Sequence, residues 1–422
     1  MENQTILFYK HDHEEIDWHR INRYSSCVIF TDQPSAILGV DEKIPIIEVP
    51  NIREAYWKFI DYYRGLFPIP VIAVTGTCGK TTTKEMIKHI LSENYHVQAT
   101  YKSRNASNYD LPYLLGIDQN TDVAVFETGV ARPGDITESC RYFKPQIGII
   151  TNIGFDHLNR CKTIENYIEA KAEILDVVDE QGTLILNADD DNIKKVNLDR
   201  FKGRVLTFGF NDRADFRILN IVYKEGSQHF TFMFQQLKHS CRVPGLGRHN
   251  VYNAMAAMAA VWSLGVGLQQ ASDRLVSLQH LDDRSQLCVG IEGSTVINDT
   301  WSTNPTSIRS ALEVLQDLSQ GKIKMVIIGK LNRMGEWKNQ LDTMVGKLIA
   351  EAKVDWLITV DNEAREMARS AVLNGMNPQK VFSFDTAEEL VKFVPSLLSQ
   401  NVVILIKVEY GFEVIKAKLI RK

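Results

Sequence analysis

Apolar residues occur along the chain in two alternating patterns. Short runs of consecutive apolar residues, such as Val71–Thr75 and Val402–Lys407, predict buried strands. Between these runs lie segments whose apolar residues repeat every three or four positions, such as Thr82–Glu93, and this spacing predicts amphipathic helices. Strands and helices in alternation imply mostly parallel sheets with helices on both faces. We therefore expect an α/β fold.

The alternation divides the 422 residues into three expected domains. Residues 1–70 predict a small N-terminal α/β domain. Residues 71–284 predict a central domain with a mostly parallel sheet, whose edge turns antiparallel between residues 204 and 242. Residues 285–422 alternate again and predict a doubly wound, Rossmann-like C-terminal domain.

A glycine-rich stretch follows the strand Val71–Thr75 and leads into a helix that begins near Lys80. Such a turn brings backbone N–H groups and a helix N-terminus close to phosphate oxygens, while Lys80 adds a positive charge and Thr81 a hydroxyl for Mg²⁺. The segment therefore predicts a site for a nucleoside triphosphate. Its expected contact residues are Gly76, Thr77, Gly79, Lys80, Thr81 and Thr82.

Composition narrows the class of protein. A net charge of −4 argues against a general nucleic-acid-binding protein. No apolar stretch approaches the roughly 20 residues that a membrane-spanning helix needs. The six cysteines are scattered without a Cys-x-x-Cys pair, which is typical of reduced thiols. We expect a monomeric cytoplasmic protein.

Three residues follow successive expected strands of the central sheet at the same edge, namely Thr81, Glu127 and His157. Ligands collect at this edge of open parallel sheets, and Mg²⁺ prefers the oxygen ligands that Thr81 and Glu127 supply. Taken alone, His157 is more often a surface or hydrogen-bonded loop histidine, but its position after the expected strand Gln146–Asn152 favours a site.

Lys171 interrupts the apolar face of the expected helix Ile164–Val178, where Ile164, Ile168 and Leu175 share its spacing. One interpretation is a lysine at the rim whose ammonium extends to water. The other is an inward lysine that loses its charge and is carbamylated, which would give a carboxylate able to hold a second magnesium ion.

The chain contains seven motifs that resemble those of the Mur ligases and occur in the same order. Mur ligases are the ATP-dependent peptide-bond-forming enzymes of cell-wall synthesis, and the motifs are most similar to those of the MurF branch, which adds D-alanyl-D-alanine. They begin at Thr75, Phe126, Ile150, Glu169, Leu186, Gly247 and Ile297, and read TGTCGKTTTKEM, FETGVARPGDI, ITNIGFDHL, EAKAEIL, LNADD, GRHNVYNA and INDTWSTNP.

The resemblance implies roles for individual residues. Lys80 and Thr81 would bind phosphates and the first Mg²⁺, with Glu127 between two metal ions, and His157 and carbamylated Lys171 would hold the second. The remaining positions would contact the nucleotide or the acid substrate: Asn253 the adenine, Asp299 the ribose, Arg284 the γ-phosphate, Asn152 the nucleotide and Asn108 the acid substrate.

The implied reaction joins a carboxylate to an amine or dipeptide. The carboxylate would attack the γ-phosphate of ATP to form an acyl phosphate, which the amine then attacks. Closure of the C-terminal domain over the site would exclude water.

Three departures from the MurF pattern bear on the substrates. The N-terminal region lacks an Asp-Ser-Arg signature of a uridine-nucleotide pocket, the stretch 404–411 replaces a Lys-Gly-Ser-Arg motif, and Lys330 replaces an Asp. We therefore expect weak uridine recognition. An amide ligase for an acid without UDP, of secondary-metabolite or polyglutamate type, is the alternative. Outside the ligases, a P-loop kinase or a non-catalytic nucleotide-binding protein stays open.

Overall fold

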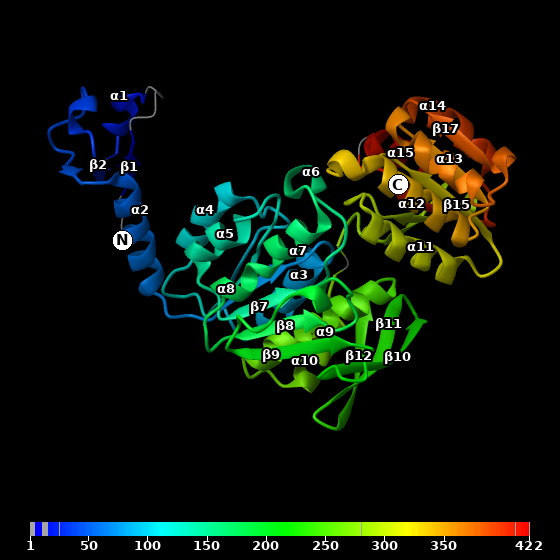
Figure 1. The fold of residues 1–422 in the computed structure, drawn as a ribbon, viewed down its shortest axis with the longest axis horizontal. Coiled ribbons are helices and arrows are strands. Elements are labelled where there is room, and N and C mark those ends of the chain that lie inside the picture. Colours follow the sequence, from blue (N-terminus) through cyan, green and yellow to red (C-terminus); the bar gives the residue numbers. More distant parts are fainter. Residues whose placement is uncertain (1–4, 11–15, 25, 280, 410, 422) are drawn as a thin grey trace. The chain divides into compact units, whose positions relative to one another are not determined.

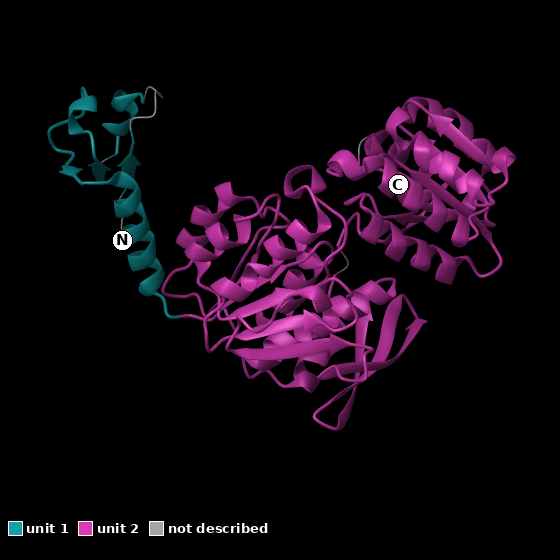
Figure 2. Cartoon of the chain, in the orientation of Figure 1, with its two compact units in different colours: residues 1–68 teal, residues 69–422 magenta. Residues whose placement is uncertain are grey.

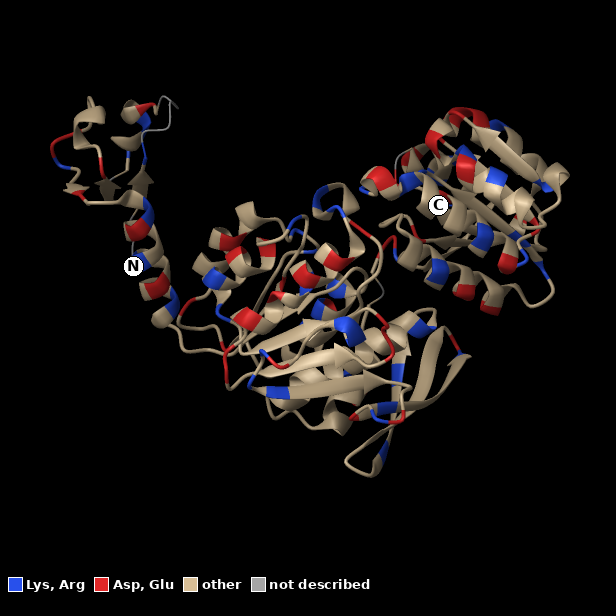
Figure 3. Ribbon diagram, viewed as in Figure 1, with Lys and Arg blue, Asp and Glu red and all other residues tan. Residues whose placement is uncertain are grey.

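The computed structural model describes residues 5–10, 16–24, 26–279, 281–409 and 411–421. Contacts divide the chain into two compact units, residues 1–68 and 69–422 (Figure 2). Within the described residues, no helix has the length and apolar character to cross a membrane. Basic and acidic side chains are interspersed along both units (Figure 3).

The first unit is a three-stranded parallel sheet in the order β1-β2-β3 (Figure 1). Helix α2 follows the sheet, and the side chain of Asn51 caps its first turn by accepting a hydrogen bond from the Glu54 N–H. Strand β3 is shorter than the expected run from residue 44 to 49. The elements are β1 (Thr5–Tyr9), α1 (Trp18–Ile21), β2 (Cys27–Thr31), β3 (Ile46–Glu48) and α2 (Ile52–Gly65).

The second unit contains a nine-stranded sheet in the order β12-β11-β10-β9-β8-β7-β4-β6-β5. Its strands pair in parallel from β5 to β10, and β11 and β12 continue antiparallel, as expected for this edge. The strands are β4 (Val71–Thr75), β5 (Val97–Ala99), β6 (Val123–Glu127), β7 (Ile147–Ile150), β8 (Thr183–Asn187), β9 (Arg204–Gly209), β10 (Phe216–Lys224), β11 (Ser227–Phe234) and β12 (Leu237–Pro244).

Helices cover both faces of this sheet because successive side chains of a strand point to opposite faces. In β4, Ile72 and Val74 pack with α3 and α9, whereas Ala73 packs on the other face with α5, α7 and α8. The helices are α3 (Lys80–Leu91), α4 (Asp110–Leu115), α5 (Asp135–Phe143), α6 (Leu158–Cys161), α7 (Ile164–Ala172), α8 (Ile174–Val177), α9 (Arg248–Ser263) and α10 (Leu268–Leu275).

The expected helix from residue 164 to 178 is wrong in one respect, because it forms two helices, α7 and α8. Glu173 lies at the junction. Its carboxylate accepts hydrogen bonds from the backbone N–H groups of Gly134 and Thr137, which ties the junction to the first turn of α5.

A six-stranded sheet, in the order β13-β14-β18-β15-β16-β17, forms the C-terminal part of the second unit. Only β13 is antiparallel to its neighbour among these described strands. Helices α11, α12 and α13 cover one face, and α14 and α15 the other. The elements are β13 (Gln286–Val289), β14 (Thr295–Asn298), α11 (Pro305–Ser319), β15 (Ile323–Ile328), α12 (Lys338–Glu351), β16 (Trp356–Val360), α13 (Arg365–Leu373), β17 (Val381–Phe384), α14 (Ala387–Phe393), β18 (Val402–Lys407) and α15 (Phe412–Leu419).

Candidate active site

The loop between β4 and α3 has the backbone shape of a phosphate cradle. A Cβ atom at Gly76 would lie 2.0 Å from Thr151 Oγ1, and one at Gly79, where φ is +84°, would lie 2.2 Å from Asn253 Oδ1. Glycine is therefore required at both positions. Lys80 Nζ bends back over the loop and donates hydrogen bonds to the carbonyl oxygens of Gly76 at 3.0 Å and Thr77 at 3.1 Å.

Asn152 holds this loop in place from the end of β7. Its side-chain oxygen accepts a hydrogen bond from Cys78 N at 2.9 Å, and its Nδ2 donates to Cys78 O at 2.9 Å. The backbone carbonyl of Asn152 also accepts from Thr77 N at 2.9 Å. Any contribution of Asn152 to nucleotide binding therefore includes fixing the loop.

Thr81 and Glu127 meet where β4 and β6 lie side by side. The Thr81 hydroxyl donates to Glu127 Oε2 at 2.9 Å, and Asn105 Nδ2 donates to Glu127 Oε1 at 2.6 Å. The Glu127 N–H is bonded to Thr100 Oγ1. These contacts fix a buried carboxylate beside a hydroxyl at the start of the helix.

His157 is the N-cap residue of α6, in the loop that follows β7, and β7 flanks β4 on the other side. Its backbone is in the left-handed region, with φ of +52°. Its pKa is lowered to about 4, chiefly by burial, with smaller contributions from the charges of Arg333 and Lys171, whereas Asp156 opposes the shift. The imidazole is therefore neutral near pH 7, the state in which it binds metal ions.

Lys171 lies inside the protein, with 1% of its surface exposed. Its ammonium contacts Thr75 Oγ1 at 3.3 Å and lies 5.2 Å from the centre of the Tyr167 ring. The interpretation of a rim lysine that extends to water is wrong. Burial, with the charge of Lys80 next, lowers the pKa of Lys171 well below its usual value, which favours a neutral amine.

Two charged residues of the C-terminal part, buried Lys407 and half-buried Asp299, form an ion pair. Lys407 Nζ donates to Asp299 Oδ2 at 2.9 Å and to Ser307 Oγ at 3.1 Å, and Asp299 Oδ1 accepts from Ser285 N at 2.9 Å. Next to Ser285, the guanidinium of Arg284 lies 4.5 Å from the centre of the Trp301 ring.

These groups line one cavity of about 1370 Å³, a volume that accommodates more than one substrate. Most residues expected at the nucleotide and metal site line this cavity. Gly76 is not among the lining residues. The lining includes Thr77, Gly79, Lys80, Thr81, Thr82, Glu127, Asn152, His157, Lys171, Asn253, Arg284 and Asp299.

Asn108 is not among the lining residues, whereas Asn105 is. Asn108 is exposed in the 3₁₀ turn Ser107–Tyr109, and Asn105 instead reaches Glu127. Sequence reasoning also passed over Asp156, Arg333 and Lys407, which line the cavity as well. Lys407 could have been predicted from the sequence, because it ends an apolar strand at the edge of the sheet where ligands collect.

The donor atoms fit a magnesium nucleotide. Thr81 and Glu127 offer hard oxygen ligands beside the loop, and Lys80 and Arg284 offer positive charge for phosphates. In the described part of the chain, no group of three or more His, Cys, Asp or Glu side chains forms a complete metal site. Phosphate oxygens and water would have to supply the remaining ligands.

Two family models match the chain. The Mur ligase middle domain matches residues 74–261, and the Mur ligase glutamate ligase domain matches residues 283–408. The chain is 30% identical over 373 residues to the UDP-N-acetylmuramoyl-tripeptide–D-alanyl-D-alanine ligase of Bacillus subtilis, covering 88% of this chain and 80% of that protein. The Escherichia coli ligase of the same name is 26% identical, covering 79% and 73%.

Solved structures of MurF enzymes are also similar to this chain. MurF from Acinetobacter baumannii matches with a TM-score of 0.82 and 26% identity, covering 99% of this chain and 91% of that chain. MurF from Thermotoga maritima, solved in complex with ADP, shares the fold with a TM-score of 0.80 at 21% identity, covering 99% and 98%. By its motifs, its fold and these similarities, the chain belongs to the Mur ligase family.

Proposed function

We propose that this protein joins D-alanyl-D-alanine to the terminal carboxylate of a UDP-linked muramoyl tripeptide, with conversion of ATP to ADP and phosphate. The names of its relatives in Bacillus subtilis and Escherichia coli support these substrates. One observation carries the reaction type: the phosphate loop, the Thr81–Glu127 pair and Arg284 line the same cavity, which also has room for an acid and an amine.

The first step activates a carboxylate. Its oxygen attacks the γ-phosphorus, the bond to the β-phosphate oxygen breaks, and ADP leaves. Lys80 and Arg284 stabilise the charge on the transferring group, because both carry fixed positive charge at the cavity wall. Mg²⁺, held by Thr81 and Glu127, would add further positive charge at the phosphates.

The second step forms the amide. The amine attacks the acyl carbon, the tetrahedral intermediate loses phosphate, and the nitrogen gives up a proton. Water competes with the amine for the acyl phosphate, so both domains must cover the reacting atoms. Residues from both matched domain regions contribute to the cavity, including Lys80 from one and Asp299 from the other.

Lys171 has a specific place in this proposal. A neutral, buried amine can combine with carbon dioxide, and the resulting carbamate would stand near neutral His157 as an oxygen ligand for a second metal ion. The carbamate is a prediction, as are the adenine contact of Asn253 and the ribose contact of Asp299.

The proposal also assigns one substrate to each domain. Residues 1–70 would bind the acid-substrate side, 71–284 the nucleotide and 285–422 the amine. The protein would work as a cytoplasmic monomer on small-molecule substrates.

The test is product analysis with purified protein, ATP, Mg²⁺, the UDP-linked muramoyl tripeptide and D-alanyl-D-alanine. We expect ADP, phosphate and the amide in equal amounts, with no phosphate release when the acid is omitted. Phosphorylation of an acceptor without amide formation would instead identify a kinase.

A further inference from the structure

The segment between β15 and α12 departs from the MurF pattern at Lys330, and the proposed chemistry does not use it. This segment docks on the short helix α6 of the central domain. Arg333 O accepts a hydrogen bond from Asn159 N at 3.0 Å, and Trp337 Nε1 donates to Lys162 O at 2.7 Å. At Gly335, where φ is +59°, a Cβ atom would lie 2.8 Å from Asn159 Cα, so the two backbones are in close contact.

The same segment reaches the carboxylate that precedes His157. Arg333 Nε lies 3.2 Å from Asp156 Oδ1, and that oxygen also accepts the His157 N–H at 2.8 Å. Only 5% of the surface of Asp156 is exposed, whereas the side chain of Arg333 is 38% exposed, so the ion pair joins a buried carboxylate to a guanidinium that still reaches water.

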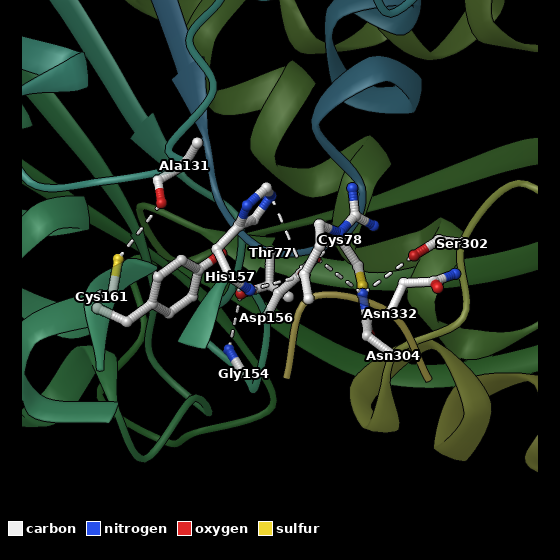
Figure 4. A network of polar contacts seen from close by, with 12 residues as sticks. Thr77, Cys78, Ala131, Gly154, Asp156, His157, Cys161, Ser302, Asn304 and Asn332 are labelled. Carbon is white, nitrogen blue, oxygen red and sulfur yellow. Dashed lines mark hydrogen bonds and ion pairs between the residues drawn. The ribbon is translucent and has the colours of Figure 1, made fainter. Parts of the chain in front are cut away.

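Asn304 forms a second connection between the domains, and Figure 4 shows it beside Asp156 and Cys78. Its Nδ2 lies 3.4 Å from Asp156 Oδ2, and its Oδ1 accepts from the Cys78 thiol at 3.6 Å. Asn304 also caps α11 by accepting from Ser307 N at 2.9 Å. One C-terminal side chain therefore contacts both Asp156 and the phosphate loop.

Together these contacts hold the chain on both sides of His157. Asp156 precedes His157 and is bound by Arg333, while α6 follows it directly and is bound by the backbone of Arg333 and by Trp337. We propose that Asp156 and Arg333 are positioning residues for ligation: their ion pair keeps the C-terminal domain docked beside His157 and thereby keeps water away from the acyl phosphate.

The consequence rests on the proposed function. The phosphate loop is held by contacts within the central domain, such as those of Asn152, so it should keep its shape on undocking, and saturating ATP should offset the loss of the contacts proposed for Arg284 and Asp299. Undocking instead lets water attack the acyl carbon. The bond between that carbon and the phosphate oxygen then breaks, which regenerates the acid and releases phosphate without an amide.

The experiment compares Arg333→Met, Asp156→Asn and the double variant with wild type. Arg369→Met is the matched control, because Arg369 lies in the same domain, is 74% exposed and pairs only with Glu366 three residues earlier among its described ion pairs. We measure amide formed per phosphate released, ATP affinity, and hydrogen exchange of the peptide 157–163.

We expect both single variants to lower the amide-to-phosphate ratio at saturating ATP by at least about three-fold, because more of the acyl phosphate reacts with water. Hydrogen exchange should rise in the peptide 157–163, and the double variant should be no worse than the poorer single variant. The control should match wild type.

An unchanged ratio and unchanged exchange in a folded Arg333→Met protein would overturn the inference. If that variant does not fold, Trp337→Phe removes the N–H donor to Lys162 together with part of the ring, and should still raise exchange in the peptide 157–163. If wild type makes no amide, the proposed function fails, and the exchange measurement alone decides whether Arg333 docks the domain.

Discussion

The hydroxyl of Thr81 donates a 2.9 Å hydrogen bond to Glu127, joining the first turn of the phosphate-loop helix to the end of the neighbouring strand. A hydroxyl and a carboxylate at this spacing can both turn to one Mg²⁺ when a nucleotide is bound.

Glu127→Gln should therefore lower kcat by at least about 100-fold and raise the Mg²⁺ concentration needed for half-maximal rate, because an amide is a weaker ligand and carries no charge. The measurement is a Mg²⁺ titration of ligation at saturating ATP. Exposed Glu180 provides the control, as Glu180→Gln. A Glu127→Gln enzyme with wild-type Mg²⁺ dependence would remove Glu127 from the metal site.

Lys171→Ala should abolish ligation and leave ATP binding largely intact, since Lys171 Nζ contacts Thr75 at the end of β4, whereas the loop carbonyl groups of Gly76 and Thr77 are bonded by Lys80. If the carbamate forms, bicarbonate should stimulate ligation by wild-type enzyme that has been depleted of carbon dioxide. A small carboxylic acid should partly restore ligation by the Lys171→Ala variant. ¹³C NMR with labelled bicarbonate detects the carbamate directly. Near-normal turnover of the variant would leave Lys171 with a packing role only.

His157 gives a stability prediction. Its pKa is about 4 in the folded protein and near 6.5 when unfolded, so between these values the unfolded chain binds the extra proton. Wild type should lose stability as pH falls through this window, by up to about 3 kcal/mol from this group. In urea denaturation, the free energy of unfolding of His157→Asn should fall less than that of wild type between pH 7 and 4.5.

Exposed Gln181, which has no titrating group, supplies the comparison for that experiment, because Gln181→Asn should keep the pH dependence of wild type. Equal slopes for wild type and His157→Asn would show that the folded protein does not disfavour the charged imidazole.

The sequence predicted the alternating elements, and most of the residues it singled out as candidates line the same cavity, because both depend on local patterns. The runs before Gly76, Glu127 and His157 are buried strands, and in the sheet they lie side by side in the order β7-β4-β6. Asp156, Asn304 and Arg333 were not found, since their contacts depend on how two domains dock. Lys171 was read from helical spacing, but its burial needed the packed structure.

Uridine recognition by the N-terminal unit remains a prediction from the sequence. A pocket without its hydrogen-bond partners loses binding energy, so we expect the UDP-linked muramoyl tripeptide to be preferred over its UDP-free counterpart by less than ~100-fold in kcat/KM, about 2.7 kcal/mol. Steady-state kinetics with saturating ATP and D-alanyl-D-alanine decide this. A larger preference would show ordinary MurF recognition.

The central claim is that a carboxylate oxygen attacks the γ-phosphate of ATP in this cavity. The most direct test supplies the acid substrate with ¹⁸O in its carboxylate and analyses the released phosphate by mass spectrometry. We predict ADP together with phosphate that carries one ¹⁸O atom from the acid. AMP and pyrophosphate as products, or phosphate free of ¹⁸O, would contradict the acyl-phosphate account.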